Sequence, residues 1–373
     1  MGDSHVRAVL RLHLADGVGA VTYLRLVKAF GSAEAVLAAG PAEWLRVPHI
    51  GEKIVAAISA ITDKDVDDEL AVAERAGARV LTQESVEYPL SLKHIDDPPA
   101  VLYVRGSLRE SDAVSLGVVG SRRCTHYGLE QAQRFGELLG QAGLTLISGG
   151  ARGIDTAAHR GALQAGGRTV AVMGCGLCTH FPPENGEFFE SIVRDGRGAL
   201  LSELPMRTAV LAGNFPTRNR IISGLSLGVL IVEAARRSGS LITAREAAEQ
   251  GKTVFAIPGR VDSPTSQGAN DLIRNGAILT QGLDDVLEHL GPVGQSLTDA
   301  KAAEPTLPFA PANMDATEQR IWDALAAAPR TLDELVRATN LETARATAAM
   351  TMLVIKGAVK QQPGNLFARK TSK

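Results

Sequence analysis

The sequence predicts an α/β protein with an extended Rossmann-like, mostly parallel sheet, an N-terminal helical domain and a C-terminal winged helix. Short apolar segments alternate with amphipathic stretches between about residues 80 and 290. Glycine-separated helical segments precede this region, and a proline-bearing segment follows it. Short apolar strands that alternate with helices are typical of a parallel sheet whose two faces are both covered.

The central domain, predicted at 75–290, contains the expected strands. They are Leu116–Val119, Leu144–Ser148, Thr169–Met173, Ala199–Ser202, Val229–Glu233, Val254–Ile257 and Ala277–Thr280. Amphipathic helices are expected between them, for example over Leu129–Gln141 and Ala244–Gln250. In such sheets ligands bind beyond the carboxyl ends of the strands.

The N-terminal domain, predicted at 1–70, reads as short helices broken by glycine. Asp16–Gly19 and Val47–Lys53 resemble the turns of helix-hairpin-helix or SAM-like domains. Such a turn either directs backbone N–H groups at a phosphate or serves only for packing. The acidic stretch Asp63–Glu69 predicts a solvated helix face.

The C-terminal part begins with a predicted linker at 291–313, because four prolines occur there without hydrophobic periodicity. A winged helix is expected at 314–373. Its predicted elements are helices at Met314–Ala328, Thr331–Thr339 and Glu342–Lys356, and a wing from Gly357–Lys360 and Asn365–Ala368.

The composition indicates a cytoplasmic protein. Arg7, Arg11 and His13 interrupt any apolar leader, and no apolar run is long enough to span a membrane. Three cysteines in 373 residues fit a reducing compartment. The net charge of −2 gives no global sign of nucleic-acid binding, so local charge matters more.

Small and basic residues follow several of the predicted strands. These loops are Gly120–Arg123, Ser148–Asp155 and Glu233–Ser240. Small residues allow close approach of an anion, and a following helix N-terminus favours negative charge. A single loop of this kind is explained by the tight turn that its glycines allow. Several of them on the same edge of a sheet predict a groove that binds phosphate groups.

The segment Asn214–Arg220 adds two arginines beside an aromatic residue. Arginine binds phosphate in a bidentate manner, and Phe215 offers a surface for base stacking unless it belongs to the core. From Pro205 to Arg260 the chain carries an excess of five positive charges. This concentration is typical of a nucleic-acid contact.

The sequence contains three patterns that could indicate a metal, cofactor or catalytic site, and each has a simpler interpretation. Cys175 and Cys178 have CxxC spacing, but too few further ligands accompany them for zinc. The glycines near Cys175 lack the complete dinucleotide fingerprint, so no cofactor is expected. Asp155 and His159 share a helix face, where a capping Asp and a locally bonded His are the simpler interpretation. No metal and no catalytic residue are therefore predicted.

In this context the sequence resembles the DprA/Smf (DNA-processing protein A) family over about Tyr88–Leu287. The blocks that carry the resemblance are Tyr88–Leu90, Pro99–Gly106, Val119–Arg122, Ser148–Asp155 with His159, Ser202-Glu203, Phe215–Ile222, Ser238–Ala244 and Pro258-Gly259. The resemblance implies a non-catalytic, dimeric single-stranded-DNA-binding protein that protects incoming DNA and loads RecA during natural transformation. It implies DNA contacts by Ser121, Arg122, Arg152, Phe215 and Arg220.

Together, the loops and the resemblance predict one nucleic-acid site. Its expected residues are Ser121, Arg122, Gly149, Gly150, Arg152, Phe215, Arg218, Asn219, Arg220, Ser238, Gly239 and Ser240. One departure from the family pattern is Pro183, which stands where a basic residue is common. If the central domain alone binds single-stranded DNA, a fragment of about residues 75–295 should keep most of the affinity of the full chain for single-stranded DNA.

Two other functions remain as alternatives. A Rossmann-like nucleotide phosphoribohydrolase would also have glycine-rich loops. Those enzymes place a Pro-Gly-Gly-x-Gly-Thr loop before a helix with a catalytic glutamate, and the comparable loop here, Arg236–Ser240, does not match it. A winged-helix transcription factor would read bases through the predicted third helix. That helix offers mainly Thr343, Arg345 and Thr347 as base readers.

Overall fold

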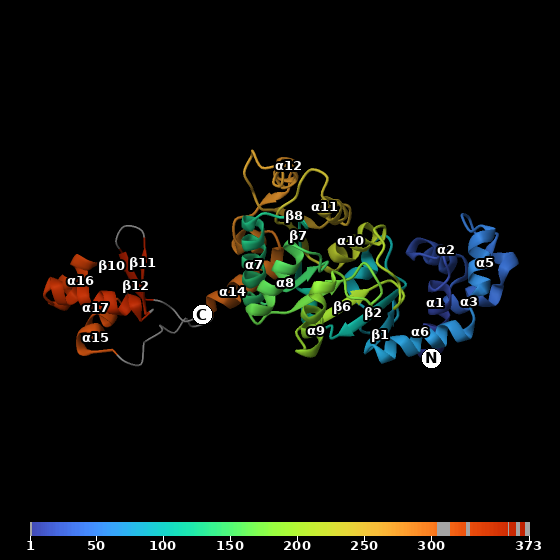
Figure 1. Cartoon of the computed structure of the whole chain (residues 1–373), viewed down its shortest axis with the longest axis horizontal. Helices are drawn as coiled ribbons and strands as arrows, with labels where there is room; N and C mark the ends of the chain where they lie inside the picture. The colour runs from blue at the N-terminus through green and yellow to red at the C-terminus, as the bar shows by residue number, and fades with distance from the viewer. Residues whose placement is uncertain (1, 304–313, 326–328, 357, 363–365, 370–373) are drawn as a thin grey trace. The chain divides into compact units, whose positions relative to one another are not determined.

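The computed structural model describes residues 2–303, 314–325, 329–356, 358–362 and 366–369. Its contacts divide the chain into two compact units, Met1–Thr298 and Asp299–Lys373 (Figure 1). Within the described residues, none of the helices combines the length and the apolar character that crossing a bilayer would require.

The first unit is built on one large sheet. Its strands lie in the order β1 (Ala78–Thr82), β2 (Val101–Gly106), β6 (Gly198–Ser202), β5 (Thr169–Val172), β4 (Thr145–Ser148), β3 (Ser115–Val119), β7 (Gly228–Ile231), β8 (Thr253–Ala256) and β9 (Ile278–Leu279). All neighbours from β6 to β9 pair in parallel. The predicted mostly parallel α/β fold is confirmed, and each predicted strand occurs.

The strands β1 and β2 were not predicted. They pair antiparallel with each other, and β2 pairs antiparallel with β6. Only 3₁₀ turns, η1 (Leu90–His94) and η2 (Glu110–Ala113), flank β2. The alternation of strands with long helices that revealed the parallel core is therefore missing at this edge.

Helices cover both faces of the sheet because successive strand residues point to opposite sides. Val118 belongs to one apolar cluster with α7 (His126–Gln141), α8 (Ile154–Gln164) and α13 (Leu283–Glu288). Val119 belongs to another, with α10 (Asn214–Leu225), α11 (Ser240–Glu249) and α12 (Gln267–Arg274). The loops after the central strands lie between these two layers.

The N-terminal helices lie beside the β1 and β2 edge of the sheet (Figure 1). They are α1 (Gly2–His13), α2 (Ala20–Phe30), α3 (Ala33–Ala39), α4 (Pro41–Trp44), α5 (Glu52–Ala60) and α6 (Asp63–Arg75). Their buried residues form one continuous apolar cluster with residues of β2, β5, β6 and α9 (Gly186–Arg194). The acidic stretch begins α6, but Glu69 is buried and its carboxylate accepts the Met206 N–H at 2.7 Å.

The predicted linker is helical where the structure describes it. Residues Gly291–Ala303 form α14, so the expectation of irregular structure is wrong for this segment. Pro292 is the second residue of the helix, where its missing N–H costs no intrahelical bond. The rest of the predicted linker, 304–313, lies outside the described residues.

The second unit contains a winged helix, as predicted. Its elements are α15 (Ala316–Ala324), β10 (Arg330–Thr331), α16 (Leu332–Thr339), α17 (Thr343–Ile355), β11 (Val359–Gln362) and β12 (Leu366–Arg369). The strands pair in the order β10-β12-β11. Residues 326–328, Gly357, Asn365 and 370–373 of the predicted elements lie outside the described residues.

Candidate nucleic-acid interface

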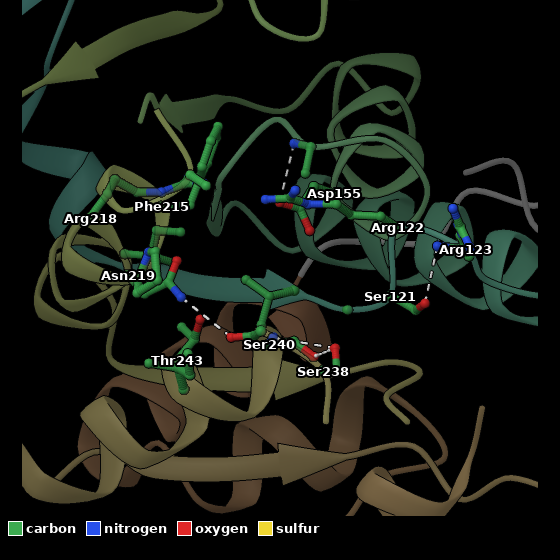
Figure 2. A pocket seen from close by; sticks show the side chains of 18 of the residues that line it. Ser121, Arg122, Arg123, Asp155, Phe215, Arg218, Asn219, Ser238, Ser240 and Thr243 are labelled. Carbon is green, nitrogen blue, oxygen red and sulfur yellow. Dashed lines mark hydrogen bonds between the residues drawn. The ribbon is translucent and has the colours of Figure 1, made fainter. Parts of the chain in front are cut away.

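A pocket of about 810 Å³ lies at the carboxyl ends of the central strands (Figure 2). The loops after β3 and β7, the start of α10 and the first turn of α11 form much of its wall. The predicted site residues on this wall are Ser121, Arg122, Phe215, Arg218, Asn219, Ser238, Gly239 and Ser240. Segments that are distant in sequence, from Val119 to Thr265, thus converge on one cavity because parallel strands end at the same sheet edge.

Phe215 is half-buried on the pocket wall and is stacked by its neighbours. The Arg122 guanidinium lies 4.8 Å from the centre of its ring, and the Phe181 ring centre lies 5.6 Å away. A Cβ atom on Gly174 would come within 2.8 Å of the same ring. Glycine is therefore needed there, and Arg122 and Phe215 act as one packed pair rather than as two separate side chains.

Arg218 and Asp155 are two buried side chains of opposite charge at the pocket. Arg218 is 4% exposed and Asp155 is 5% exposed. Burial lowers the pKa of the Arg218 guanidinium to about 10, so it stays charged at neutral pH. Burial also raises the pKa of Asp155, and the charge of Arg218 acts in the opposite direction. Among the described residues the wall carries Arg122, Arg123 and Arg218 against one carboxylate, so the pocket favours anions.

The serine loop before α11 differs from its prediction. A helix N-terminus was expected to offer its N–H groups to an anion, but the Ser240 N–H at the start of α11 donates to the Ser238 hydroxyl at 3.3 Å. The two serine hydroxyls lie 2.8 Å apart, and the Asn219 side-chain amide donates to the Gly239 carbonyl at 3.4 Å (Figure 2). The loop therefore offers hydroxyl groups more than free backbone amides.

Glu233, which the sequence analysis did not single out, holds three of these loops together. It is buried, and its carboxylate accepts the Thr125 N–H at 2.7 Å and the Thr265 hydroxyl at 2.6 Å. Its backbone carbonyl accepts the Ser121 N–H at 2.7 Å. A carboxylate directly after an apolar buried strand was the signal that could have revealed it, since a buried charge must be hydrogen-bonded.

Four predicted site residues are not on the pocket wall. Gly149 and Gly150 lie under protein side chains, because a Cβ atom at Gly149 would collide with the Arg218 guanidinium and one at Gly150 with Phe189. Arg152 is exposed and pairs with Glu184. Gly149 and Gly150 are therefore covered by protein side chains, whereas Arg152 remains on the surface, with its guanidinium 5.9 Å from the centre of the Phe181 ring on the pocket wall.

Arg220 is the fourth of these residues. It is 4% exposed and points to a second cavity, of about 520 Å³, next to the Asp16–Gly19 turn. Its guanidinium pairs with Asp97 at 2.7 Å and with Glu203 at 2.6 Å. The two carboxylates therefore already accept the guanidinium N–H groups that would otherwise bind a phosphate.

The disfavoured catalytic groups are engaged in the fold. Asp155 accepts the N–H groups of Gly149 and Ala151 at 3.2 and 3.3 Å. His159 lies 2.5 Å from the Thr169 hydroxyl, and burial lowers its pKa to about 3. No group of His, Cys, Asp and Glu side chains within the described part of the chain is arranged to hold a metal.

The comparisons with known proteins agree with this architecture. The family model described as DNA recombination-mediator protein A matches residues 79–291. The chain belongs to this family. Two further models of the same family match at the ends: the DprA-like N-terminal HHH domain at residues 3–71 and the DprA winged helix domain at residues 302–365. The resemblance inferred from the sequence is confirmed.

Individual members of the DNA recombination-mediator protein A family are similar over long segments. Protein Smf of Escherichia coli is 46% identical over 61% of this chain, and the match spans 60% of the Smf chain. The X-ray structure of DNA processing protein A from Streptococcus pneumoniae has a TM-score of 0.65 and 32% identity, and covers 76% of this chain and 97% of its own. The structure of DNA processing protein A from Helicobacter pylori was reported for its single-stranded DNA binding mode. It has a TM-score of 0.50 and 29% identity, and the match covers 60% of this chain and 98% of the Helicobacter pylori chain.

Proposed function

We propose that this protein binds single-stranded DNA through the sugar-phosphate backbone, in the pocket at the carboxyl ends of the central strands. The observation that carries the proposal is the convergence of Arg122, Arg123 and Arg218 with serine hydroxyls and a half-buried aromatic ring in one cavity. Arginines that track a backbone, together with rings that stack on bases, are the usual means of binding single strands without sequence preference. The single-stranded DNA binding mode of the Helicobacter pylori relative supports the same assignment.

The finer parts of the proposal concern the cellular role. We propose a cytoplasmic, non-catalytic protein that forms dimers, protects incoming DNA and loads RecA in natural transformation. Family membership supports this role. Analytical ultracentrifugation tests the dimer, and RecA filament formation on DNA coated with a single-strand-binding protein tests the loading. Release of free base from AMP by the pure protein would instead favour the phosphoribohydrolase alternative.

The binding should depend strongly on salt. Each phosphate neutralised on a single strand contributes about −0.7 to the slope of log affinity against log salt concentration. Roughly three to five contacts then give a slope of about −2 to −4 per protomer. Gel-shift or anisotropy titrations between about 50 and 200 mM salt measure it. A flat response, or tighter binding to duplex than to single strands, would contradict the proposal.

Alanine substitutions of Arg122 and Phe215 should affect DNA binding in different ways, and their effects should be coupled. Arg122→Ala should make the salt slope shallower by about 0.7, because one phosphate contact is lost. Phe215→Ala should cost about 1–3 kcal/mol of binding free energy and leave the slope unchanged. Because the guanidinium lies on the ring, the double variant should lose less than the sum of the two single losses.

A double-mutant cycle on oligothymidylate measures this coupling. Circular dichroism and thermal melting of each variant serve as the control. If Phe215→Ala unfolds the protein, Phe215 is a core residue and has no assigned part in binding. Strictly additive losses would show that the stacked pair separates before DNA enters the pocket.

A further inference from the structure

The exposed arginines around the pocket differ in whether a carboxylate already neutralises them. After β4, Arg152 is paired with Glu184 on the loop after β5, with Nη2 and Oε2 2.9 Å apart. After β7, Arg236 pairs with Asp271 at 3.2 Å. After β8, Arg260 pairs with Asp262 at 2.7 Å. These pairs lower the positive potential that each arginine presents to a passing phosphate.

Arg123 and Arg237 are different. Both side chains are exposed, and neither has a carboxylate partner among the described residues. Arg123 follows Arg122 on the loop after β3, and Arg237 precedes Ser238 on the loop after β7. Because β3 and β7 are neighbours in the sheet, these loops are adjacent. We call Arg123 and Arg237 the β3–β7 lip. In Figure 2 Arg123 lies on the outer side of Ser121, while Arg122 reaches inward.

The β5 and β6 sides of the pocket carry arginines that are already paired with carboxylates. On the β5 side, the exposed Glu184 is already paired with Arg152, so this pair offers no free cation to a phosphate. Beyond α10, on the β6 side, the second cavity is lined by Asp16, Asp97 and Glu203. A strand that left the pocket on the β5 side would meet the neutral Arg152–Glu184 pair, and one that left past the second cavity would meet more carboxylates than cations.

We propose that single-stranded DNA leaves the pocket across the β3–β7 lip, where Arg123 and Arg237 bind the phosphates that flank the nucleotides in the pocket. The inference rests on the proposed function and adds a direction to it. The pocket fixes a few nucleotides, and the unpaired arginines on one lip fix the course of the adjoining backbone.

The test compares alanine variants in the full-length protein, with two oligothymidylates. One oligomer, of about 20 nucleotides, exceeds the roughly 4–16 nucleotides that a single binding fold covers, and the other has about 4. Arg123→Ala and Arg237→Ala probe the lip. Arg236→Ala is the matched control, because it removes a neighbouring arginine that is already paired with Asp271. Arg207→Ala probes the β6 side, where an exposed arginine follows β6.

Each lip variant should make the salt slope for the long oligomer shallower by about 0.7. Arg237→Ala should leave the affinity for the short oligomer unchanged, and Arg236→Ala and Arg207→Ala should leave the slope unchanged. Unchanged slopes for both lip variants, or a shallower slope for Arg207→Ala alone, would overturn the proposed direction. If the unmodified protein binds neither oligomer, the proposed function itself fails, which separates the two outcomes.

Discussion

Removal of residues 1–74 should leave the central region unable to fold into a soluble, DNA-binding domain. The N-terminal helices and the sheet share one apolar cluster, and the His13 and Tyr103 rings lie 6.2 Å apart across it. Val101 and Tyr103 of β2 are fully buried in this cluster. Each large side chain newly exposed to water costs about 1.5–3 kcal/mol. The exposure of about five of them would therefore be comparable to the roughly 5–15 kcal/mol that stabilises a typical domain.

The truncated protein also loses a buried polar contact. The Glu69 carboxylate that accepts the Met206 N–H would be gone, and this amide would lose its hydrogen-bond partner. Expression yield, size-exclusion chromatography and thermal melting of a 75–298 fragment measure the effect. The matched control is the fragment 1–298, which removes the second compact unit and should melt like the full chain.

This expectation replaces the one drawn from the sequence, in which a fragment of about 75–295 keeps most of its single-strand affinity. If that fragment is folded and binds DNA within about tenfold of the full protein, equivalent to about 1.4 kcal/mol, the shared cluster contributes little. The N-terminal helices would then be a separate accessory domain, as the sequence first indicated.

The sheet and its loops could be predicted because buried parallel strands have a local signature. Runs such as Leu116–Val119 are continuously apolar and end at glycine or serine. The antiparallel strand Val101–Gly106, which lies between β1 and β6, is apolar apart from Arg105, but no amphipathic helix follows it, so the same pattern did not identify it. Pro292 was taken as a sign of irregular structure, although proline is compatible with the first turn of a helix.

The positions of individual side chains were harder to predict than the loops. Arg218 and Arg220 are two residues apart on α10, which places them on opposite sides of a helix with 3.6 residues per turn. Their sequence surroundings are equally basic. Which of them reaches the pocket depends on how α10 packs against the sheet and against Asp97 and Glu203, and these residues are distant in sequence.

Arg220→Ala should therefore destabilise the fold rather than weaken DNA binding. Burial acts against the charge of Arg220, yet the Glu203 and Asp97 carboxylates raise its pKa above the ordinary value. Removing one partner of a buried ion pair costs about 3–5 kcal/mol, because the remaining charge stays buried and unpaired. Glu203 is only 15% exposed and would be left in that state. Urea unfolding should show the loss as a lower midpoint with a similar slope.

The matched control for Arg220→Ala is Arg236→Ala, which breaks an exposed pair with Asp271 and should cost less than about 1 kcal/mol. The folded fraction of Arg220→Ala should bind oligothymidylate with unchanged affinity and an unchanged salt slope, since Arg220 lies on the second cavity. The opposite pattern, normal stability with weaker binding and a shallower slope, would mean that Arg220 leaves its carboxylates to bind phosphate. In that case the site predicted from the sequence would describe the DNA-bound state better than the present arrangement of α10.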